Sequence, residues 1–241
     1  MKISDTVNNR IDRFKAGYVF TYEDFSLPVE NINALKKVLS RLTESGKIVR
    51  LSKGKYYKAK EGIIGPLKPD EYQVVKDLLE ENGKIMGYLT GVSAFNKLGL
   101  STQVSNTIQI GTNIDKKSKK RGKYTIRFIR QKNTINKDNI PLLQILDAIR
   151  LINRIPDANV NQSCERLKSI ILDLSDSDQE YLIKLAMKYN PATRALTGAI
   201  LESIKDENYA ETLYKTLRGT TTFNLNISEN ILKNKDKWQI R

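Results

Sequence analysis

Polar and basic side chains recur between residues 31 and 41 at a spacing that would let one helical face contact DNA. They are Asn31, Asn33, Lys36, Lys37, Ser40 and Arg41. An Asn side chain can form two hydrogen bonds with adenine, whereas Lys or Arg can reach guanine or a backbone phosphate. Residues near the start of a recognition helix contact base edges. We therefore expect Asn31, Asn33 and Lys37 to read bases.

A helix that begins after Glu30 and ends at Gly46 must position these side chains. Its apolar residues follow spacings of 3, 3, 1 and 3, which define a single buried stripe. They are Ile32, Leu35, Val38, Leu39 and Leu42. The polar residues fall on the opposite side, so we expect the helix to present them to solvent.

The elements around this helix follow the order of a winged helix-turn-helix. The spacing predicts a helix over 3–14, an extended piece at 18–20, and a short helix opened by Thr21 with Asp24 in a capping box. Two strand-like runs, 47–51 and 55–58, then form a hairpin. We expect three residues near its tip to contact a phosphate or a minor groove: Lys53, Lys55 and Tyr56. The alternative is a small α+β module whose polar face is only hydrated.

The charge of the chain is concentrated rather than uniform. The sequence has 41 Lys and Arg against 27 Asp and Glu, a formal charge of +14. Residues 1–60 hold 13 of the basic and 6 of the acidic residues, and residues 115–132 hold 9 and 1. Two concentrated patches indicate two places where a polyanion could bind.

The second basic patch centres on residues 116–123. Alternating apolar residues predict strands over 106–112 and 124–130, which we expect to pair antiparallel. The loop between them carries six basic residues: Lys116, Lys117, Lys119, Lys120, Arg121 and Lys123. Like charges repel unless something neutralises them. Two interpretations stay open, a solvated tip and a second contact with the DNA backbone.

Several kinds of catalytic chemistry are excluded by residue type. The chain has no His, which removes His bases, His nucleophile systems and His metal ligands. Cys164 is the single Cys, so one chain cannot assemble a cysteine zinc site. No phosphate-binding glycine loop is present. We expect no catalytic residues, no metal and no cofactor.

The chain reads as two domains of a mixed α+β protein. We predict a winged helix-turn-helix over 1–61, a Gly- and Pro-rich linker over 62–69, and a larger, mainly helical α+β domain over 70–241 with a small antiparallel sheet. In the second domain Thr90 is the expected cap of a helix that ends at Gly99.

Further helices are expected over the rest of the second domain. The predicted segments are 140–155, which is apolar almost all round, and then 163–174, 178–189, 191–204 and 207–217. The alternation in 220–227 predicts a late strand.

No segment of the sequence predicts a membrane or secretory role. The first residues lack the apolar core of a secretory signal, and no apolar stretch reaches the ~18 residues that a membrane helix needs. We expect a soluble, cytoplasmic protein.

Three segments of the sequence resemble AbiEi-type antitoxins of bacterial abortive-infection systems. The first two, 17–21 and 34–42 continued by 46–57, are similar to the winged-helix start of that family. The third, 87–103 with 106–108, is similar to the first helix and strand of its second domain. The resemblance covers about residues 1–130 and includes no catalytic motif.

The resemblance implies a DNA-binding antitoxin that represses its own operon. Such antitoxins bind inverted repeats in their promoter and counter a nucleotidyltransferase-like toxin, without necessarily forming a stable complex. The DNA residues would then be those of 31–41 together with Lys53 and Lys55, and the 116–123 residues would add a second contact. No specific antitoxin residue can be matched in 140–241.

Two alternatives come from other functional classes. One is a nuclease or nucleotidyltransferase that uses the DNA-binding module for targeting, but the sequence lacks a carboxylate pair followed by a Lys on one strand. The other is an RNA-binding regulatory module. Competition between RNA and promoter DNA would separate it from a repressor.

Overall fold

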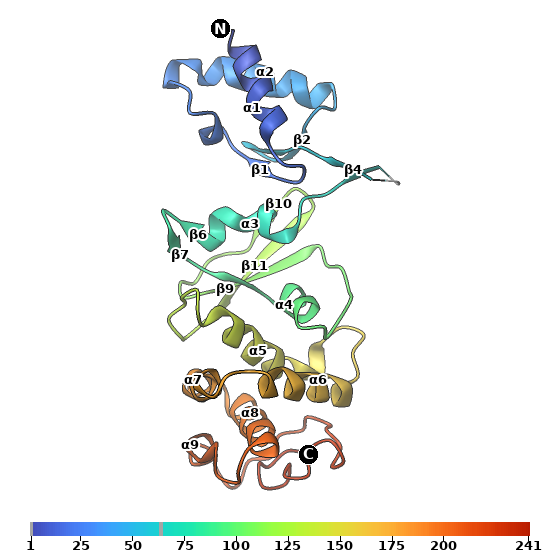
Figure 1. Ribbon diagram of the computed structural model, residues 1–241, viewed down its shortest axis with the longest axis vertical. Helices are drawn as coiled ribbons and strands as arrows, with labels where there is room; N and C mark the ends of the chain where they lie inside the picture. Colours follow the sequence, from blue (N-terminus) through green and yellow to red (C-terminus); the bar gives the residue numbers. More distant parts are fainter. Residues whose placement is uncertain (1, 63–64) are drawn as a thin grey trace. The chain divides into compact units, whose positions relative to one another are not determined.

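The computed structural model describes residues 2–62 and 65–241 of the chain. It has a mixed α+β fold that divides into two compact units (Figure 1). The first unit consists of Met1–Asp77 and Lys119–Tyr124, and the second of Leu78–Ser118 and Thr125–Arg241.

The first unit begins with helices and a three-stranded antiparallel sheet. The elements are α1 (Ile3–Arg13), β1 (Val19–Phe20), the 3-10 helices η1 (Glu23–Phe25) and η2 (Val29–Asn31), α2 (Ile32–Glu44), β2 (Val49–Ser52) and β3 (Lys55–Tyr57). The strand order is β1-β3-β2, so the first strand pairs with the last. Val19 lies opposite Tyr57 on one side of β3, and Val49 lies opposite the same residue on the other.

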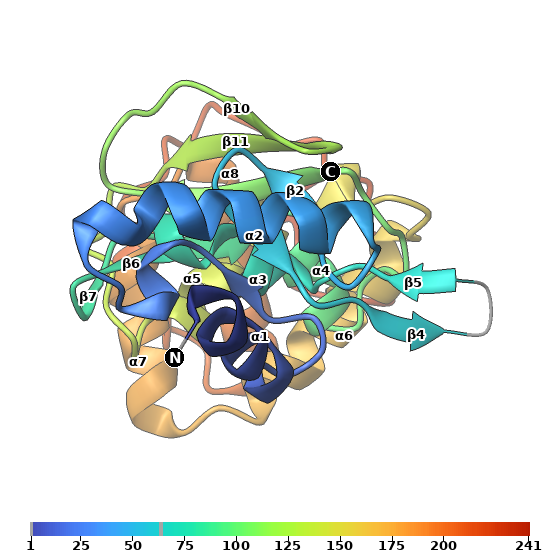
Figure 2. The same cartoon turned by 90° about the horizontal axis from the view of Figure 1, so that it is seen from above.

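Apolar side chains from α1, α2 and the sheet form the core of the first unit. Val7 and Ile11 of α1, Leu35 and Leu39 of α2, and Phe20 of β1 are all fully buried. Helices α1 and α2 pack against one another, as the view from above shows (Figure 2). The helices predicted over 3–14 and 30–46 are thus confirmed, because their apolar spacing matches the helical period.

The short helix after β1 is preceded by Tyr22 and not by the predicted cap Thr21, but the predicted contact between Thr21 and Asp24 is present. The backbone N–H of Thr21 donates to the Asp24 carboxylate at 2.7 Å, and the backbone N–H of Glu23 donates to the Thr21 hydroxyl at 3.3 Å. Two backbone donors at the helix start are therefore satisfied by side chains. The helix itself is a single 3-10 turn that ends at Ser26 with φ of 49°.

The segment predicted as a linker contains a small antiparallel pair of strands. They are β4 (Lys60–Gly62) and β5 (Gly65–Leu67), and residues 63–64 lie outside the described part of the chain. Helix α3 (Glu71–Leu79) follows, and the side chain of its Gln73 accepts a hydrogen bond from the backbone N–H of Val19 at 3.2 Å. Residues 70–77 consequently group with the first unit.

The strands of the second unit differ from the predicted antiparallel pair. They are β6 (Glu80–Glu81), β7 (Lys84–Ile85), β8 (Tyr88–Thr90), β9 (Thr107–Thr112) and β11 (Tyr124–Arg130), whose first residue groups with the first unit. Strands β9 and β11 fall where predicted, but they pair parallel, and β8 pairs antiparallel with β9. The prediction of direction was wrong because side-chain alternation identifies a strand and not its orientation.

A strand within the basic run explains the parallel pairing. Strand β10 (Lys119–Arg121) occupies the outer position of the order β10-β11-β9-β8. The chain turns back into β11 at Gly122, where φ is +57°. The connection from β9 to β11 is therefore a crossover that contains its own strand, and not a simple hairpin loop.

Thr90 ends a strand instead of capping a helix. Its hydroxyl donates to the buried Asp147 carboxylate at 2.7 Å, and the residue before α4 (Val92–Lys97) is Gly91, with φ of 63°. The prediction of Thr90 as the cap was therefore wrong. A strand at 88–90 places this hydroxyl against α5, where it satisfies a buried acid.

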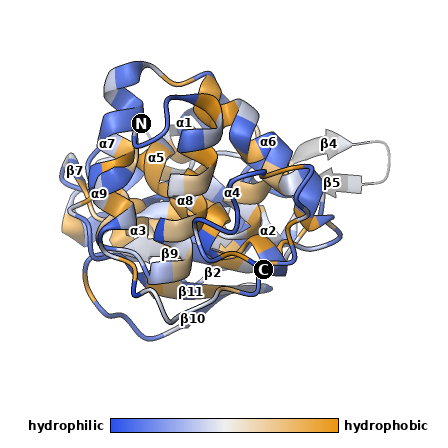
Figure 3. Cartoon of the chain, turned by 90° about the horizontal axis from the view of Figure 1, so that it is seen from below, coloured by the Kyte–Doolittle hydropathy of each residue, from blue (hydrophilic) through white to orange (hydrophobic). Residues whose placement is uncertain are grey.

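The remaining elements of the second unit are helical. They are α5 (Ile140–Arg150), the 3-10 helix η3 (Ile152–Arg154), α6 (Val160–Leu172), α7 (Asp176–Ala186), α8 (Pro191–Ile204) and α9 (Glu211–Tyr214). Helix α5 packs against α7 and α8, and both α5 and α8 are rich in apolar residues (Figure 3). Every residue from Leu142 to Ile149 is buried, as expected for a central helix.

The predicted strand over 220–227 is absent from the described structure, where only an isolated bridge joins Phe223 to Ile240. The backbone N–H of Phe223 donates to the Gln239 carbonyl at 2.7 Å. The alternation instead reflects packing of Phe223 and Ile227 into the core of the second unit. Trp238 of the same tail is fully buried, and its indole N–H donates to Glu202 at 2.9 Å.

The described helices include no candidate for a membrane-spanning segment. None of them, over residues 2–62 and 65–241, combines the length and the apolar character that a bilayer requires.

Candidate nucleic-acid interface

Helix α2 positions most of the predicted DNA-contacting residues on one exposed face. Five of the six lie in the helix and are exposed: Asn33, Lys36, Lys37, Ser40 and Arg41. Leu35, Val38 and Leu39 point the other way and are buried. The amphipathic pattern therefore does bring these polar side chains together.

The sixth residue, Asn31, occupies the boundary between η2 and α2. It ends η2 and is the residue before the first turn of α2, but its side chain makes no capping hydrogen bond. Its side chain is half-buried. Asn33 is consequently the better exposed of the two amides.

Few of the α2 side chains are engaged by acidic partners. The Lys36 ammonium lies 5.8 Å from the centre of the Tyr22 ring, and the Ser40 hydroxyl donates to Glu44 at 3.0 Å. Lys37 and Arg41 make no hydrogen bond or ion pair with the described residues. Their charge remains available to an external anion.

The hairpin β2–β3 places its three predicted contact residues in different surroundings. Lys53 at the tip is exposed. Lys55 has a side chain only 18% exposed, and its ammonium forms an ion pair with Asp77 at 3.0 Å. Tyr56 is 6% exposed and its ring stacks on Phe20. Tyr56 is therefore part of the core of the first unit and, unlike Lys53, does not present its side chain to solvent.

Asp77 of α3 neutralises two of the predicted contact residues together. Its carboxylate receives two hydrogen bonds from Arg121, at 2.6 and 3.0 Å, as well as the Lys55 ion pair. Arg121 also donates to the Val74 carbonyl and is 8% exposed. Burial by itself would raise the pKa of Asp77, but the two cations outweigh it and hold the pKa below its ordinary value.

The six basic residues of 116–123 are divided between the two units. Lys119, Lys120 and Lys123 are exposed and belong to the first unit, whereas Lys116 and Lys117 belong to the second. Arg121 is buried, so this residue fits neither a solvated tip nor a contact with the DNA backbone. A Cβ at Gly122 would lie 2.6 Å from the Leu51 carbonyl oxygen, so the turn approaches β2 closely.

Sequence reasoning missed Asp77 and a second basic surface on α1. Asp77 lies 44 positions from Arg121, and no local pattern relates them. Arg10 and Arg13, in the last turn of α1, line a hollow of about 320 Å³ with Phe25 and Ser26. The Arg10 guanidinium donates to the Asp24 carbonyl at 3.2 Å. The signal for this surface was the basic last turn of α1.

The described residues include no candidate metal-binding cluster. Over residues 2–62 and 65–241, no three His, Cys, Asp or Glu side chains lie together in a way that could hold an ion.

Comparison with protein families identifies a relationship for most of the chain. A model described as "Family of unknown function (DUF6088)" matches residues 6–180. The chain belongs to DUF6088. The match spans the whole α2 face and the basic run of 116–123, so both features lie inside the DUF6088 region. No curated protein matches the sequence.

One solved structure supports the fold of this DUF6088 protein. It is the crystal structure of RV2827C protein from Mycobacterium tuberculosis, with a TM-score of 0.61 and 15% sequence identity. The alignment covers 98% of this chain and 89% of that chain. The similarity therefore extends over both units and concerns the fold alone.

Proposed function

We propose that this DUF6088 protein binds double-stranded DNA through α2 and acts as a transcriptional autorepressor and antitoxin. The single observation that carries the DNA-binding part is the exposed face of α2. Asn33, Lys36, Lys37 and Arg41 combine amide and cationic donors on one side of one helix. Lys37 and Arg41 of this face make no ion pair with an acid among the described residues.

The elements around α2 support a winged helix-turn-helix as the reading module. Helix α1 and the 3-10 helices η1 and η2 precede α2, and the hairpin β2–β3 follows it directly. The order β1-β3-β2 puts the hairpin strand β3 in the middle of the sheet, so β1 anchors the hairpin along its β3 side. Lys53 at its tip would reach a phosphate beside the groove that α2 enters.

The chemistry of the α2 face favours a duplex as the ligand. Amide and guanidinium groups on one helix match the donor and acceptor pattern of the major groove of B-DNA. The major groove of an RNA helix is too deep and narrow for side chains to read. Promoter DNA is therefore preferred over double-stranded RNA as the partner.

The antitoxin part of the proposal depends on the resemblance to AbiEi-type antitoxins. That resemblance implies an operator with inverted repeats and a nucleotidyltransferase-like toxin encoded nearby. Co-expression with the adjacent gene tests it directly. The proposal requires that the neighbour alone arrests growth and that this chain restores it. A neighbour that is harmless alone would remove the antitoxin role and leave the repressor role standing.

The DNA-binding proposal is tested by titrating the full chain against its own upstream duplex. The variant K36Q/K37Q/R41Q removes three cations from α2. We expect its free energy of binding to weaken by at least ~2 kcal/mol, with the salt slope smaller by about 0.9 per lost phosphate contact. Fluorescence anisotropy at several salt concentrations measures both quantities.

A matched control separates a local contact from total charge. The variant K2Q/K15Q/K68Q removes three exposed lysines from other segments and changes the net charge equally. It should bind the operator within about twofold of the wild type at moderate salt, because exposed charges beyond a Debye length are screened. Equal losses in both variants would refute α2 as the reading helix.

A further inference from the structure

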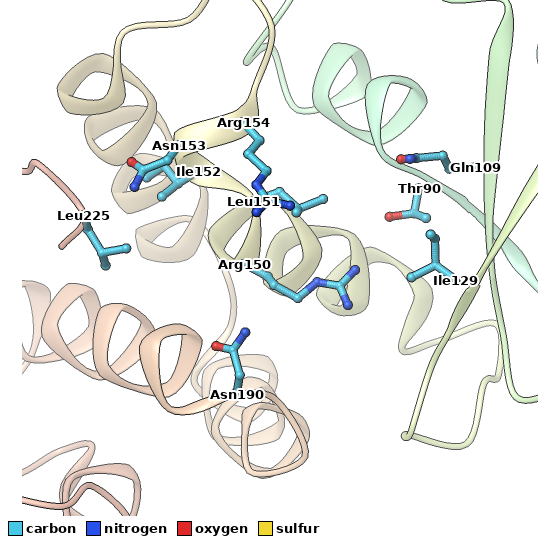
Figure 4. Close-up of a pocket in the computed structure, with 10 residues that line it drawn as sticks. All are labelled: Thr90, Gln109, Ile129, Arg150, Leu151, Ile152, Asn153, Arg154, Asn190 and Leu225. Carbon is cyan, nitrogen blue, oxygen red and sulfur yellow. The ribbon is translucent and has the colours of Figure 1, made fainter. Parts of the chain in front are cut away.

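The second unit contains two adjoining hollows that the proposed DNA contact does not use. They share Arg150, the last residue of α5, and Asn190, which precedes α8. The close-up shows the Arg150 guanidinium extending toward the strands that carry Thr90, Gln109 and Ile129 (Figure 4). Residues from three strands, from α5 and η3, and from the turn before α8 thus converge on one place.

The larger hollow combines an apolar lining with amide and cationic groups. Its volume is about 570 Å³, within the range of small-molecule sites in proteins. Ile129, Ile152 and Leu225 contribute apolar surface, while Gln109 and Arg154 add polar groups. Such a lining fits a flat heterocycle that needs both apolar contact and hydrogen bonds.

The smaller hollow is surrounded by positive charge. Its volume is about 170 Å³, and four cationic side chains line it: Arg130, Lys132, Arg150 and Lys188. None of the described residues that line either hollow is an Asp or a Glu. Two of the four cations have an acidic partner outside the lining: Arg130 lies 3.6 Å from Asp115, which is 85% exposed, and Arg150 lies 3.2 Å from Asp147.

Arg150 has hydrogen-bonding capacity that the described residues leave unused. One of its terminal nitrogens lies 3.2 Å from the buried Asp147 carboxylate, which fixes the direction of the guanidinium. Its Nε is buried without a hydrogen-bond partner in the described structure. A buried donor without a partner is costly. An anion in the adjoining hollow could accept from this guanidinium.

The same Asp147 is held rigidly by its neighbours. It accepts hydrogen bonds from Tyr88 at 2.7 Å, from Thr90 at 2.7 Å and from Tyr189 at 3.1 Å. Burial raises the pKa of Tyr88 and of Tyr189, so both hydroxyls stay protonated and keep donating. Arg150 is consequently presented by a fixed network rather than by a mobile surface.

We propose that the adjoining hollows form a binding site for a nucleoside polyphosphate, with the heterocycle in the larger hollow and the phosphates among the four cations of the smaller one. The first turn of α8 adds a helix N-terminus to the positive side, because Asn190 lines both hollows. This site lies in the second unit and is independent of the α2 face.

The length of the phosphate chain provides the first test. We would titrate the full chain with nucleoside mono-, di- and triphosphates of each of the four ribonucleosides and with tripolyphosphate, using isothermal calorimetry. For the preferred base, affinity should rise about tenfold from the mono- to the triphosphate, because each phosphate adds charge next to the cations. That triphosphate should also bind more tightly than tripolyphosphate, which lacks a heterocycle.

A pair of matched variants locates the site. K132Q/K188Q removes two exposed lysines of the smaller hollow, and K137Q/K233Q removes two exposed lysines that line neither hollow. In the first variant, affinity should rise only about threefold from the mono- to the triphosphate. In the second variant, the rise should remain about tenfold. Thermal unfolding of both variants without ligand checks that each remains folded.

Two results would overturn the proposal. One is tripolyphosphate binding as tightly as all four nucleoside triphosphates, which would indicate charge attraction with no base site. The other is equal loss in the two double variants, which would place the binding elsewhere on this basic chain. Operator binding is measured separately, so failure of this site leaves the DNA-binding proposal unaffected.

Discussion

The two basic segments of this protein, 31–41 and 116–123, were both predicted to contact DNA, but their cations have different surroundings in the structure. On α2, Lys37 and Arg41 are exposed and have no acidic partner in the described residues. In the 116–123 run, Arg121 is buried and bound to Asp77 at 2.6 Å. The same acid also binds Lys55 from the hairpin β2–β3.

The difference teaches that charge density along a sequence does not equal free charge on a surface. One carboxylate on α3 turns Arg121 from a candidate DNA contact into a structural contact, because a buried guanidinium needs a partner for its charge. On α2 the buried apolar side chains pack the helix against the core, so the cations on its exposed face need no partner within the protein. The following predictions test this contrast in order of expected effect.

The largest effect is expected from removing the acid of the structural cluster. The variant Asp77→Asn leaves Arg121 buried without its ion-pair partner, while the Val74 carbonyl still accepts from it. We expect the free energy of unfolding to fall by about 2 kcal/mol, a typical cost for a lost hydrogen bond to a charged group. Chemical denaturation followed by circular dichroism measures the change.

An exposed acid provides the control for this variant. Asp115 is 85% exposed and lies 3.6 Å from Arg130. Asp115→Asn should change the stability by less than about 0.5 kcal/mol, as exposed ion pairs usually do. If the two variants lose equal stability, the Asp77 cluster has no special structural role.

A smaller effect is expected from the amide on the α2 face. Asn33→Ala should reduce discrimination between the operator and a duplex with a changed adenine by about 1 kcal/mol, the lower end of the range for a two-bond contact. Binding to a random duplex should not change, because base contacts carry no sequence-independent affinity. A uniform loss on both duplexes would make Asn33 a phosphate contact instead.

A still smaller effect is expected from the exposed lysines of the second segment. K119S/K120S/K123S, which retains Arg121, should weaken operator binding only about threefold at moderate salt, because exposed charge contacts contribute little each. Its salt slope should fall, and base preference should stay constant. The same measurement on K116S/K117S shows whether the two halves of the run act separately. No change in either variant would identify the run as a solvated tip.

The last prediction concerns how the stability difference between the Asp77→Asn variant and the wild type changes with pH. The pKa of Asp77 is lowered in the folded protein. Its ion pairs therefore stabilise fully above the unfolded pKa of about 3.9 and are lost as the pH falls through the folded pKa. Melting temperatures measured from pH 6 to pH 2.5 should converge for the two proteins. A difference that persists at the lowest pH would attribute the loss to packing rather than charge.

The strands show which features of the fold a sequence pattern does not predict. Alternation located β9 and β11 correctly, yet it could not give their parallel direction, which depends on β10 and the turn at Gly122. The same kind of pattern in 220–227 predicted a strand, but Phe223 and Ile227 instead fill the core of the second unit. Alternation reports which side chains need burial and says nothing about what buries them.

Local periodicity located the longer helices, although the helix predicted over 207–217 is only the short α9 (Glu211–Tyr214) and the one predicted over 140–155 ends at Arg150. The apolar stripe of α2 set both its span and its exposed face, because a 3.6-residue period ties burial to position within a single element. The contact between Thr21 and Asp24 was equally readable, since its partners lie three residues apart. For the same reason the sequence alone determined which residues α2 presents to solvent.

Only the tertiary structure decided which charges stay free and which polar groups meet in the second unit. Asp77 reaches Lys55 and Arg121, which lie 22 and 44 residues away, and Asp147 meets Tyr88, Thr90 and Tyr189 across separations of 42 to 59 residues. Such pairs form because packing brings distant elements together and then penalises any buried charge left without a partner. That penalty acts on the folded arrangement, so no spacing within the sequence reveals it.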